Sequence, residues 1–195
     1  MNLPNKLTVL RMVLIPFVMF FYLANFIPFG IGKIVALVIF IVAALTDLLD
    51  GKIARKYNLV TNFGKFLDPI ADKLLTSAVL FMLMADGTIP APYGVIIVTI
   101  IIAREFMVSA LRLMAASKGT VLAADIWGKA KTMVQMIAIP VCMLIPFLWE
   151  VGAVCWLIKT VSIVGWAAIG VATVLTIVSG VNYLVKNKDC FKEDK

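Results

Sequence analysis

The sequence predicts an all-α integral membrane protein with six transmembrane helices and both termini in the cytoplasm. Of its 195 residues, 63% are hydrophobic and only 15% are charged, whereas soluble domains average roughly 45–50% apolar and about 25% charged residues. A water-soluble core of this size has no use for so many apolar side chains. We therefore expect one membrane domain that covers residues 1–195.

Six apolar segments support this fold class. Each approaches or exceeds the ~20 residues that a helix needs to cross about 30 Å of hydrocarbon. Helices are expected because a spanning helix satisfies its own backbone hydrogen bonds. The predicted spans are 8–27, 32–50, 68–85, 92–114, 126–148 and 155–185.

The positive charges predict the orientation. One set of segment ends carries Lys6, Arg11, Lys52, Arg55, Lys56, Lys65, Lys118, Lys129, Lys131, Lys186 and Lys188, and the opposite set carries Lys33 and Lys159. Loops rich in lysine and arginine stay in the cytoplasm, which places both termini there. The net charge of +7 suits an anionic membrane surface. A nucleic-acid partner is not expected, because no stacking module or basic repeat is present.

Four aspartates lie at the end of the second predicted span and at the start of the third. Asp47 and Asp50 are three residues apart and Asp68 and Asp72 are four apart, so each pair shares one face of its helix. Ionisable groups near the hydrocarbon are costly, and a functional role is the default interpretation. Converging carboxylates also repel one another unless a cation or a proton intervenes.

Divalent cations would remove this repulsion. Ligands that are all oxygen favour Mg²⁺ or Mn²⁺ over zinc or copper, and four carboxylates suffice for a two-metal site, which is used in phosphoryl chemistry. The chain has no histidine, so a histidine metal site is excluded and a general base is expected to be a carboxylate.

Small and basic residues accompany the aspartates. Gly51, Ala54 and Gly64 would let a ligand or a neighbouring helix approach the backbone closely. Arg55 suits a diphosphate. The alternative is that the small residues only pack helices and that Arg55 only anchors the chain at the membrane surface.

A second group of charged residues follows in the fourth and fifth spans. It consists of Arg104, Glu105, Arg112, Lys129 and Lys131. Glu105 and Arg112 are seven apart and share a helix face, whereas Lys129 and Lys131 do not. Basic residues that face a metal site suit an acceptor carrying a phosphate. Simple anchoring at the cytoplasmic surface is the alternative, above all for Lys131 and for Lys118.

The spacing Asp47-x2-Asp50-Gly51-x2-Ala54-Arg55-x8-Gly64-x3-Asp68-x3-Asp72 resembles the signature of the CDP-alcohol phosphotransferase family. The resemblance implies a six-helix membrane enzyme, usually homodimeric, that transfers a substituted phosphate from a CDP-linked alcohol to a second alcohol and releases CMP. It implies that the four aspartates hold two divalent cations and that Asp72 is also the candidate base. The CDP pocket would contain Gly51, Ala54, Arg55, Gly64, Thr8 and Arg11.

Four further segments, NLPNKLTVLRM, LDPIADKLL, AREFMVSALR and WGKAKT, are similar to the branch of the family that forms phosphatidylglycerophosphate. This resemblance implies CDP-diacylglycerol and sn-glycerol 3-phosphate as substrates. It also implies a bacterial inner membrane, with the active site on the cytoplasmic side. The acceptor phosphate would be bound by Arg104, Arg112, Lys129 and Lys131, with Glu105 orienting them.

Two alternatives stay open. A sister enzyme could use inositol phosphate, phosphatidylglycerol or serine as acceptor; the basic group argues against serine but not against inositol phosphate. A cation transporter would need acidic residues at the bilayer midplane, often on broken helices. The aspartates here are instead predicted at helix ends.

Overall fold

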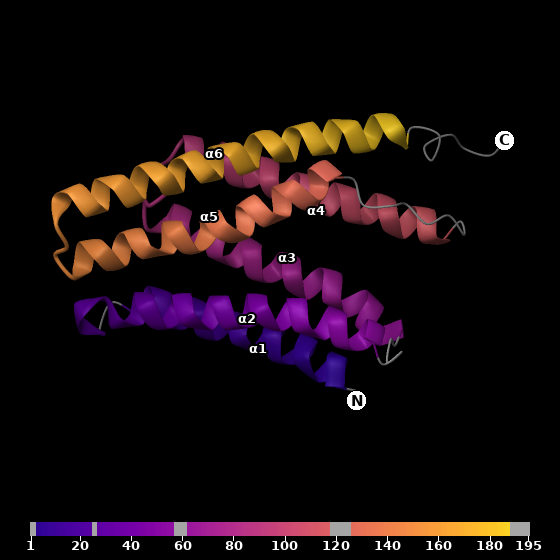
Figure 1. Cartoon of the computed structure of the whole chain (residues 1–195), viewed down its shortest axis with the longest axis horizontal. Coiled ribbons are helices and arrows are strands. Elements are labelled where there is room, and N and C mark those ends of the chain that lie inside the picture. Colours follow the sequence, from indigo (N-terminus) through magenta and orange to yellow (C-terminus); the bar gives the residue numbers. More distant parts are fainter. Residues whose placement is uncertain (1–2, 25–26, 57–61, 118–125, 188–195) are drawn as a thin grey trace.

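The computed structural model describes residues 3–24, 27–56, 62–117 and 126–187; within these ranges the side chains of 3–5, 29, 48–56, 62–69 and 116–117 are not described. The described residues form six α-helices and one 3₁₀ turn (Figure 1). The elements are α1 (Leu3–Leu23), η1 (Pro28–Gly30), α2 (Ile31–Lys56), α3 (Asn62–Ala85), α4 (Tyr93–Ser117), α5 (Ile126–Glu150) and α6 (Cys155–Lys186).

The all-helical prediction is confirmed in the described residues. Four helices are long and apolar enough to cross a membrane, through Lys6–Leu23, Tyr93–Ala115, Ile126–Glu150 and Cys155–Lys186. α2 and α3 are not among these four, because their side chains are described only in 31–47 and 70–85, and each of these stretches is shorter than a membrane span. The chain is therefore a multi-pass membrane protein with at least these four candidate spans.

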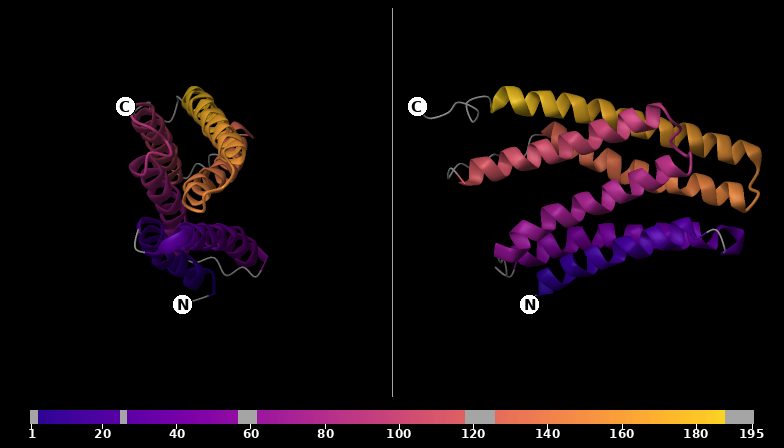
Figure 2. Two further views of the ribbon diagram at one scale, coloured as in Figure 1. Left: turned by 90° about the vertical axis from the view of Figure 1, so that its left-hand side faces the viewer. Right: turned by 180° about the vertical axis from the view of Figure 1, so that it is seen from behind.

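The helices lie side by side along the long axis of the molecule (Figure 1). α1 pairs with α2 and α5 with α6 (Figure 2), whereas α3 packs chiefly on α1 and α4 chiefly on α6. The most extensive contacts join α5 to α6 and α1 to α2, and further contacts join α1 to α3, α2 to α5 and α4 to α6. As a result α2, α3 and α5 meet in the middle of the bundle.

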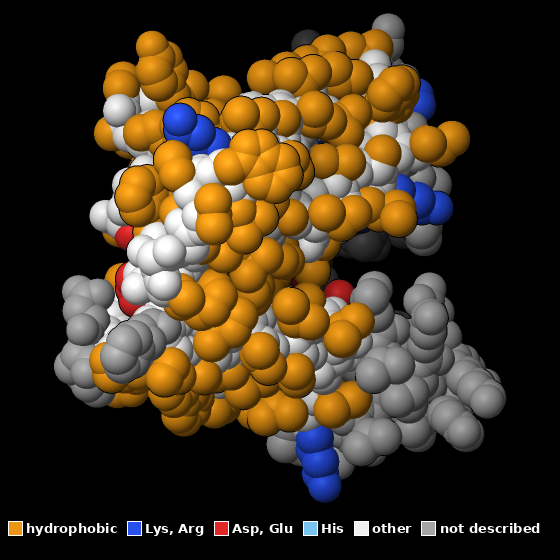
Figure 3. Space-filling view, turned by 60° about the vertical axis from the view of Figure 1, so that its left-hand side comes forward, with side chains coloured by type: hydrophobic (Ala, Val, Ile, Leu, Met, Phe, Trp, Pro, Cys, Tyr) orange, Lys and Arg blue, Asp and Glu red, His pale blue; other side chains and the backbone are white. Residues whose placement is uncertain are grey.

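The core is apolar, and so is most of the exterior. Large side chains such as Tyr22, Phe40, Leu80, Ile139 and Met143 are fully buried between helices. Many others of the same kind point outward, and hydrophobic side chains cover most of the face in Figure 3, with few charged groups among them. A surface of this kind is stable in lipid rather than in water.

The segment that carries the aspartates is more helical than expected. The sequence predicted a loop that contains Gly51, Ala54 and Arg55, but α2 continues to Lys56 and α3 already begins at Asn62. Alanine, lysine and arginine favour helix, which outweighs the single glycine. The small residues and Arg55 are thus positions on helices, and only residues 57–61 lie between them.

One glycine sets the approach of α1 and α2. A methyl group at Gly32 would lie 2.5 Å from the carbonyl oxygen of Phe21 in α1. Such a contact is impossible without moving one of the two backbones. The closeness of these helices therefore depends on the missing side chain.

We predict that Gly32→Ala lowers the free energy of unfolding by roughly 1–3 kcal/mol, the usual cost of overpacking. The matched control is Gly170→Ala in α6, where the added methyl group meets nothing within 4 Å. The control should leave stability unchanged or raise it, because alanine favours helix. Unfolding of both variants in detergent micelles measures the difference, and equal stabilities would refute the close-approach argument.

Candidate active site

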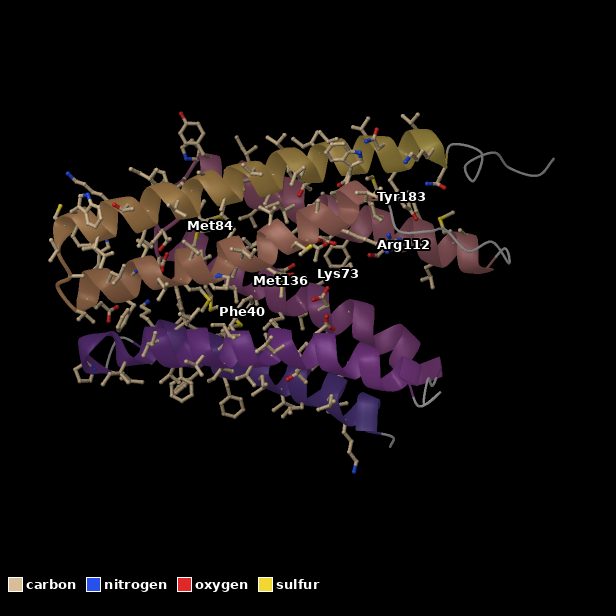
Figure 4. All side chains as sticks on the ribbon, viewed as in Figure 1. Phe40, Lys73, Met84, Arg112, Met136 and Tyr183 are labelled. Atoms are coloured by element: carbon tan, nitrogen blue, oxygen red, sulfur yellow. The ribbon has the colours of Figure 1, made fainter. Side chains whose placement is uncertain are left out.

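Two of the predicted aspartates meet at one cavity. Asp47 from α2 and Asp72 from α3 line a space of about 410 Å³ that α5 closes from the other side. The other lining residues are mostly apolar: Phe40, Ile41, Ala44, Leu45, Thr132, Met133, Met136, Ile137 and Pro140. Phe40 and Met136 can be located in Figure 4. The cavity therefore joins a carboxylate end to an apolar groove.

The charges around Asp72 are mixed. Its carboxylate is partly buried and is acted on by the negative charges of Asp47 and Glu105 and by the positive charges of Lys73 and Arg11. Two carboxylates that approach each other in a poorly solvated place favour binding of a cation.

The other two predicted ligands follow from the helix bounds. Asp50 lies in α2 three residues after Asp47, and Asp68 lies in α3 four residues before Asp72, so each shares a helix face with its partner. Their side chains lie outside the described part of the chain, as do those at Gly51, Ala54, Arg55 and Gly64. Among the described side chains, no group of three potential metal ligands is present. The oxygen donors of Asp47 and Asp72, on adjacent helices at one cavity, fit a hard divalent cation.

Arg11 in α1 is the direct partner of Asp47. Its guanidinium nitrogen lies 2.6 Å from a carboxylate oxygen of Asp47, and its side chain is completely buried while that of Asp47 is 34% exposed. Thr8, nearly one turn earlier, is also buried. The sequence placed both residues near the nucleotide. The structure brings Arg11 to the aspartate itself, so the start of α1 belongs to the site.

A second charged cluster joins α4 to α5. The ammonium group of Lys131 is fully buried and donates a hydrogen bond to the carboxylate of Glu105. A nitrogen of Arg104 lies 4.0 Å from the other oxygen of Glu105. Lys131 also interacts electrostatically with Asp72. The second cluster therefore lies within electrostatic range of the carboxylates at the cavity.

Arg104 carries an unused hydrogen-bond donor. Its Nε atom is buried and has no partner among the described residues. A buried donor without a partner costs about 1–3 kcal/mol. The described part of the chain thus provides no hydrogen-bond acceptor for the Nε atom of Arg104, which can still donate to a group from outside the chain.

The remaining predicted residues lie apart from this cluster. Arg112, two turns further along α4, donates from Nε to the hydroxyl of Tyr183 at 3.4 Å, and its guanidinium lies 5.6 Å from the centre of that ring (Figure 4). Lys129 is exposed at the start of α5. The expectation that Lys129 and Lys131 point to different sides is confirmed.

Sequence reasoning missed two residues of this region. Tyr183 in α6 is buried against Arg112, and no local pattern marks it. Gln135 lies one turn after Lys131, is 3% exposed, and has a buried side-chain oxygen without a partner among the described residues. Its spacing of four from Lys131 could have signalled it, because polar residues on one face of an apolar helix are seldom accidental.

Comparison with known proteins shows the family to which the chain is similar. The sequence model of the CDP-alcohol phosphatidyltransferase family matches residues 1–178. The chain is 42% identical to a CDP-diacylglycerol--glycerol-3-phosphate 3-phosphatidyltransferase of Bacillus subtilis, over 98% of this chain and 97% of the relative. It is 37% identical to the protein of that name from Rickettsia bellii, over 97% of both. The protein of that name from Haemophilus influenzae is 36% identical, over 94% of this chain and 91% of the relative.

We predict that Lys131→Met and Glu105→Gln each lower the free energy of unfolding by on the order of 3–5 kcal/mol, because each leaves a buried charge without its partner. The double variant should lose clearly less than the sum, since neither charge then remains. Lys129→Met is the control and should change stability by less than about 0.5 kcal/mol, because the side chain is exposed. Additive losses in the double-mutant cycle would show that the two groups do not stabilise each other.

Proposed function

Because this chain belongs to the CDP-alcohol phosphatidyltransferase family, we propose that it transfers the phosphatidyl group of CDP-diacylglycerol to sn-glycerol 3-phosphate. The products are phosphatidylglycerophosphate and CMP, and the reaction serves phosphatidylglycerol synthesis. The observation that carries the proposal is the cavity where Asp47 and Asp72 meet an apolar groove. A lipid with a charged headgroup requires this combination of surfaces.

The donor would occupy the carboxylate end with its diphosphate and the groove with part of its diacylglycerol. Asp47, Asp50, Asp68 and Asp72 would hold two divalent cations, Mg²⁺ or Mn²⁺, which neutralise charge on the diphosphate. Gly51, Ala54, Arg55 and Gly64 would form the pocket for the cytidine diphosphate, with Thr8 and Arg11 beside it. The ion pair of the buried Arg11 with Asp47 supports this arrangement, because it fixes the carboxylate at the cavity.

The acceptor would bring its own phosphate to the second cluster. The unused Nε donor of Arg104 supports this assignment, since arginine binds phosphate through directed hydrogen bonds. Glu105 would orient Arg104 and Lys131, both of which lie beside it. Arg112 and Lys129 would add positive charge at the route by which the acceptor enters.

The chemistry would be a single displacement at phosphorus. The primary hydroxyl of glycerol 3-phosphate attacks the phosphorus that bears the diacylglycerol, the new oxygen–phosphorus bond forms, and the bond to CMP breaks. CMP leaves with the bonding electrons, and the carboxylate of Asp72 accepts the hydroxyl proton. Positioning of the two substrates and stabilisation of the developing charge would supply most of the rate gain.

The finer topology belongs to the same proposal. We infer that α2 and α3 also cross the membrane, which gives six spans with both termini in the cytoplasm. The membrane would be the bacterial inner membrane, with the aspartates at its cytoplasmic face and the enzyme acting as a homodimer. The excess of lysine and arginine at this end of the helices supports that orientation.

An acceptor panel tests the reaction. Purified protein, CDP-diacylglycerol and Mg²⁺ are offered glycerol 3-phosphate, serine, inositol 1-phosphate and phosphatidylglycerol in turn, and release of CMP is followed. We expect CMP only with glycerol 3-phosphate, and we expect a chelator to abolish it. CMP release with another acceptor alone would reject the proposed acceptor but keep the family chemistry.

A substitution tests the role of Asp72. Asp72→Asn should lower kcat by on the order of 10²–10⁴, the usual contribution of a general base, while binding of CDP-diacylglycerol is largely retained. Glu150→Gln serves as the control, because Glu150 is an exposed acid at the last position of α5. If the Asp72 variant fails to bind the donor, its main role is to hold a cation and not to accept the proton.

A further inference from the structure

A second cavity lies toward the opposite end of the bundle, where α2 begins and where α3 and α5 end. It measures about 390 Å³, and its polar lining includes Lys33, Asp86, Glu150 and Ser162, with Trp149 and Trp166 beside them. Lys33 and Asp47 are fourteen residues apart in α2, which separates them by about 21 Å along the helix. The cavity is therefore distinct from the site at Asp47 and Asp72.

Lys33 is the unusual residue of this cavity. Its side chain is only 8% exposed, and its ammonium nitrogen lies 4.2 Å from the centre of the Tyr22 ring. Among the described residues it has no hydrogen-bond acceptor and no ion-pair partner. An aromatic ring stabilises the charge but leaves its three hydrogen-bond donors unused. This buried ammonium therefore borders the cavity without a direct acceptor for its hydrogen bonds in the described part of the chain, although carboxylates line the same cavity.

The neighbouring groups are already held in place. Asp86 accepts a hydrogen bond from the Tyr22 hydroxyl and another, 2.8 Å long, from the backbone N–H of Thr88. The indole N–H of Trp166 donates to the carbonyl oxygen of Thr88 at 2.9 Å. These bonds fix a carboxylate and an indole ring around the same space.

The balance of charge selects the ligand class. The lining has one ammonium group, on Lys33, and two carboxylates, on Asp86 and Glu150. A simple anion would satisfy Lys33 but would meet two negative charges. A simple cation would suit the carboxylates and the indole faces but would leave Lys33 without an acceptor. A zwitterion satisfies both sets.

We propose that this cavity binds the phosphoethanolamine headgroup of a membrane lipid. The phosphate lies on Lys33, and the ammonium group lies by the carboxylates and the indole rings. A lipid is favoured over a soluble zwitterion because Ile145 and Pro146 also line the cavity and Trp149 is 66% exposed beside it. Tryptophan in such a position is typical of the interface between membrane and water.

Calorimetric titration of the purified full chain in detergent tests the proposal. The probes are short-chain phosphatidylethanolamine, short-chain phosphatidylglycerol and free phosphoethanolamine. We expect the first to bind about tenfold or more tightly than either of the others, the difference that one charged hydrogen bond can make. Equal binding of phosphatidylglycerol would overturn the zwitterion, and equal binding of free phosphoethanolamine would overturn the lipid source.

Two matched variants assign the binding to the cavity. Lys33→Met should weaken the binding of phosphatidylethanolamine by roughly tenfold or more. Lys159→Met, which changes an exposed lysine of α6, should leave binding unchanged. Unaltered binding in the Lys33 variant would overturn the proposal. Release of CMP by this variant shows that it is folded, because the cavity is remote from the aspartates.

A second variant covers the case in which Lys33→Met does not fold. Glu150→Gln removes an exposed carboxylate and should reduce the preference for phosphatidylethanolamine over phosphatidylglycerol. An unchanged preference would contradict the assigned position of the ammonium group. Neither variant alters a residue of the proposed reaction, so a failure here leaves the proposed function untouched.

Discussion

The ion pair between the buried Arg11 and the partly exposed Asp47 is the contact on which the rest of the site depends. In a bundle with an apolar interior and an apolar exterior, an isolated carboxylate or guanidinium is very costly. Each group therefore needs the other, and their pairing fixes α1 against α2. The close approach at Gly32 fixes the same two helices at their other ends. With α1 and α2 held in this way, Asp47 faces the cavity to which α3 brings Asp72.

The same rule explains why charges extend across the bundle. Lys131 is fully buried, and it is acceptable there because Glu105 accepts its hydrogen bond. Asp72 lies between the two pairs and interacts electrostatically with Arg11 as well as with Lys131. Five helices thus contribute charged groups to one region, namely α1, α2, α3, α4 and α5. No single helix could carry these groups alone, since most of their stabilisation comes from charges on neighbouring helices.

Local patterns in the sequence could predict the helices and the carboxylate pairs, and little beyond them. Apolar runs bounded by charges predicted six helices. Spacings of three and four predicted that Asp47 shares a helix face with Asp50, and Asp72 with Asp68. The continuation of α2 through Arg55 was missed, because the end of the apolar run at Asp50 was taken for the end of the helix. The contacts of Arg11, Tyr183 and Lys33 were out of reach, since they depend on the register between helices. That register is determined by packing across the whole bundle.

In the proposed reaction, selectivity for a phosphorylated acceptor would follow from what the second cluster lacks. The Nε atom of Arg104 is buried without a partner among the described residues, so the protein bears this cost before any substrate binds. A phosphate accepts that hydrogen bond and recovers the cost, whereas a neutral alcohol leaves the donor unsatisfied at about 1–3 kcal/mol. Glu105 prevents the cluster from being indiscriminately basic, because it already neutralises Lys131. Discrimination would thus come from one unfilled donor in a low-dielectric region, and not from the total positive charge.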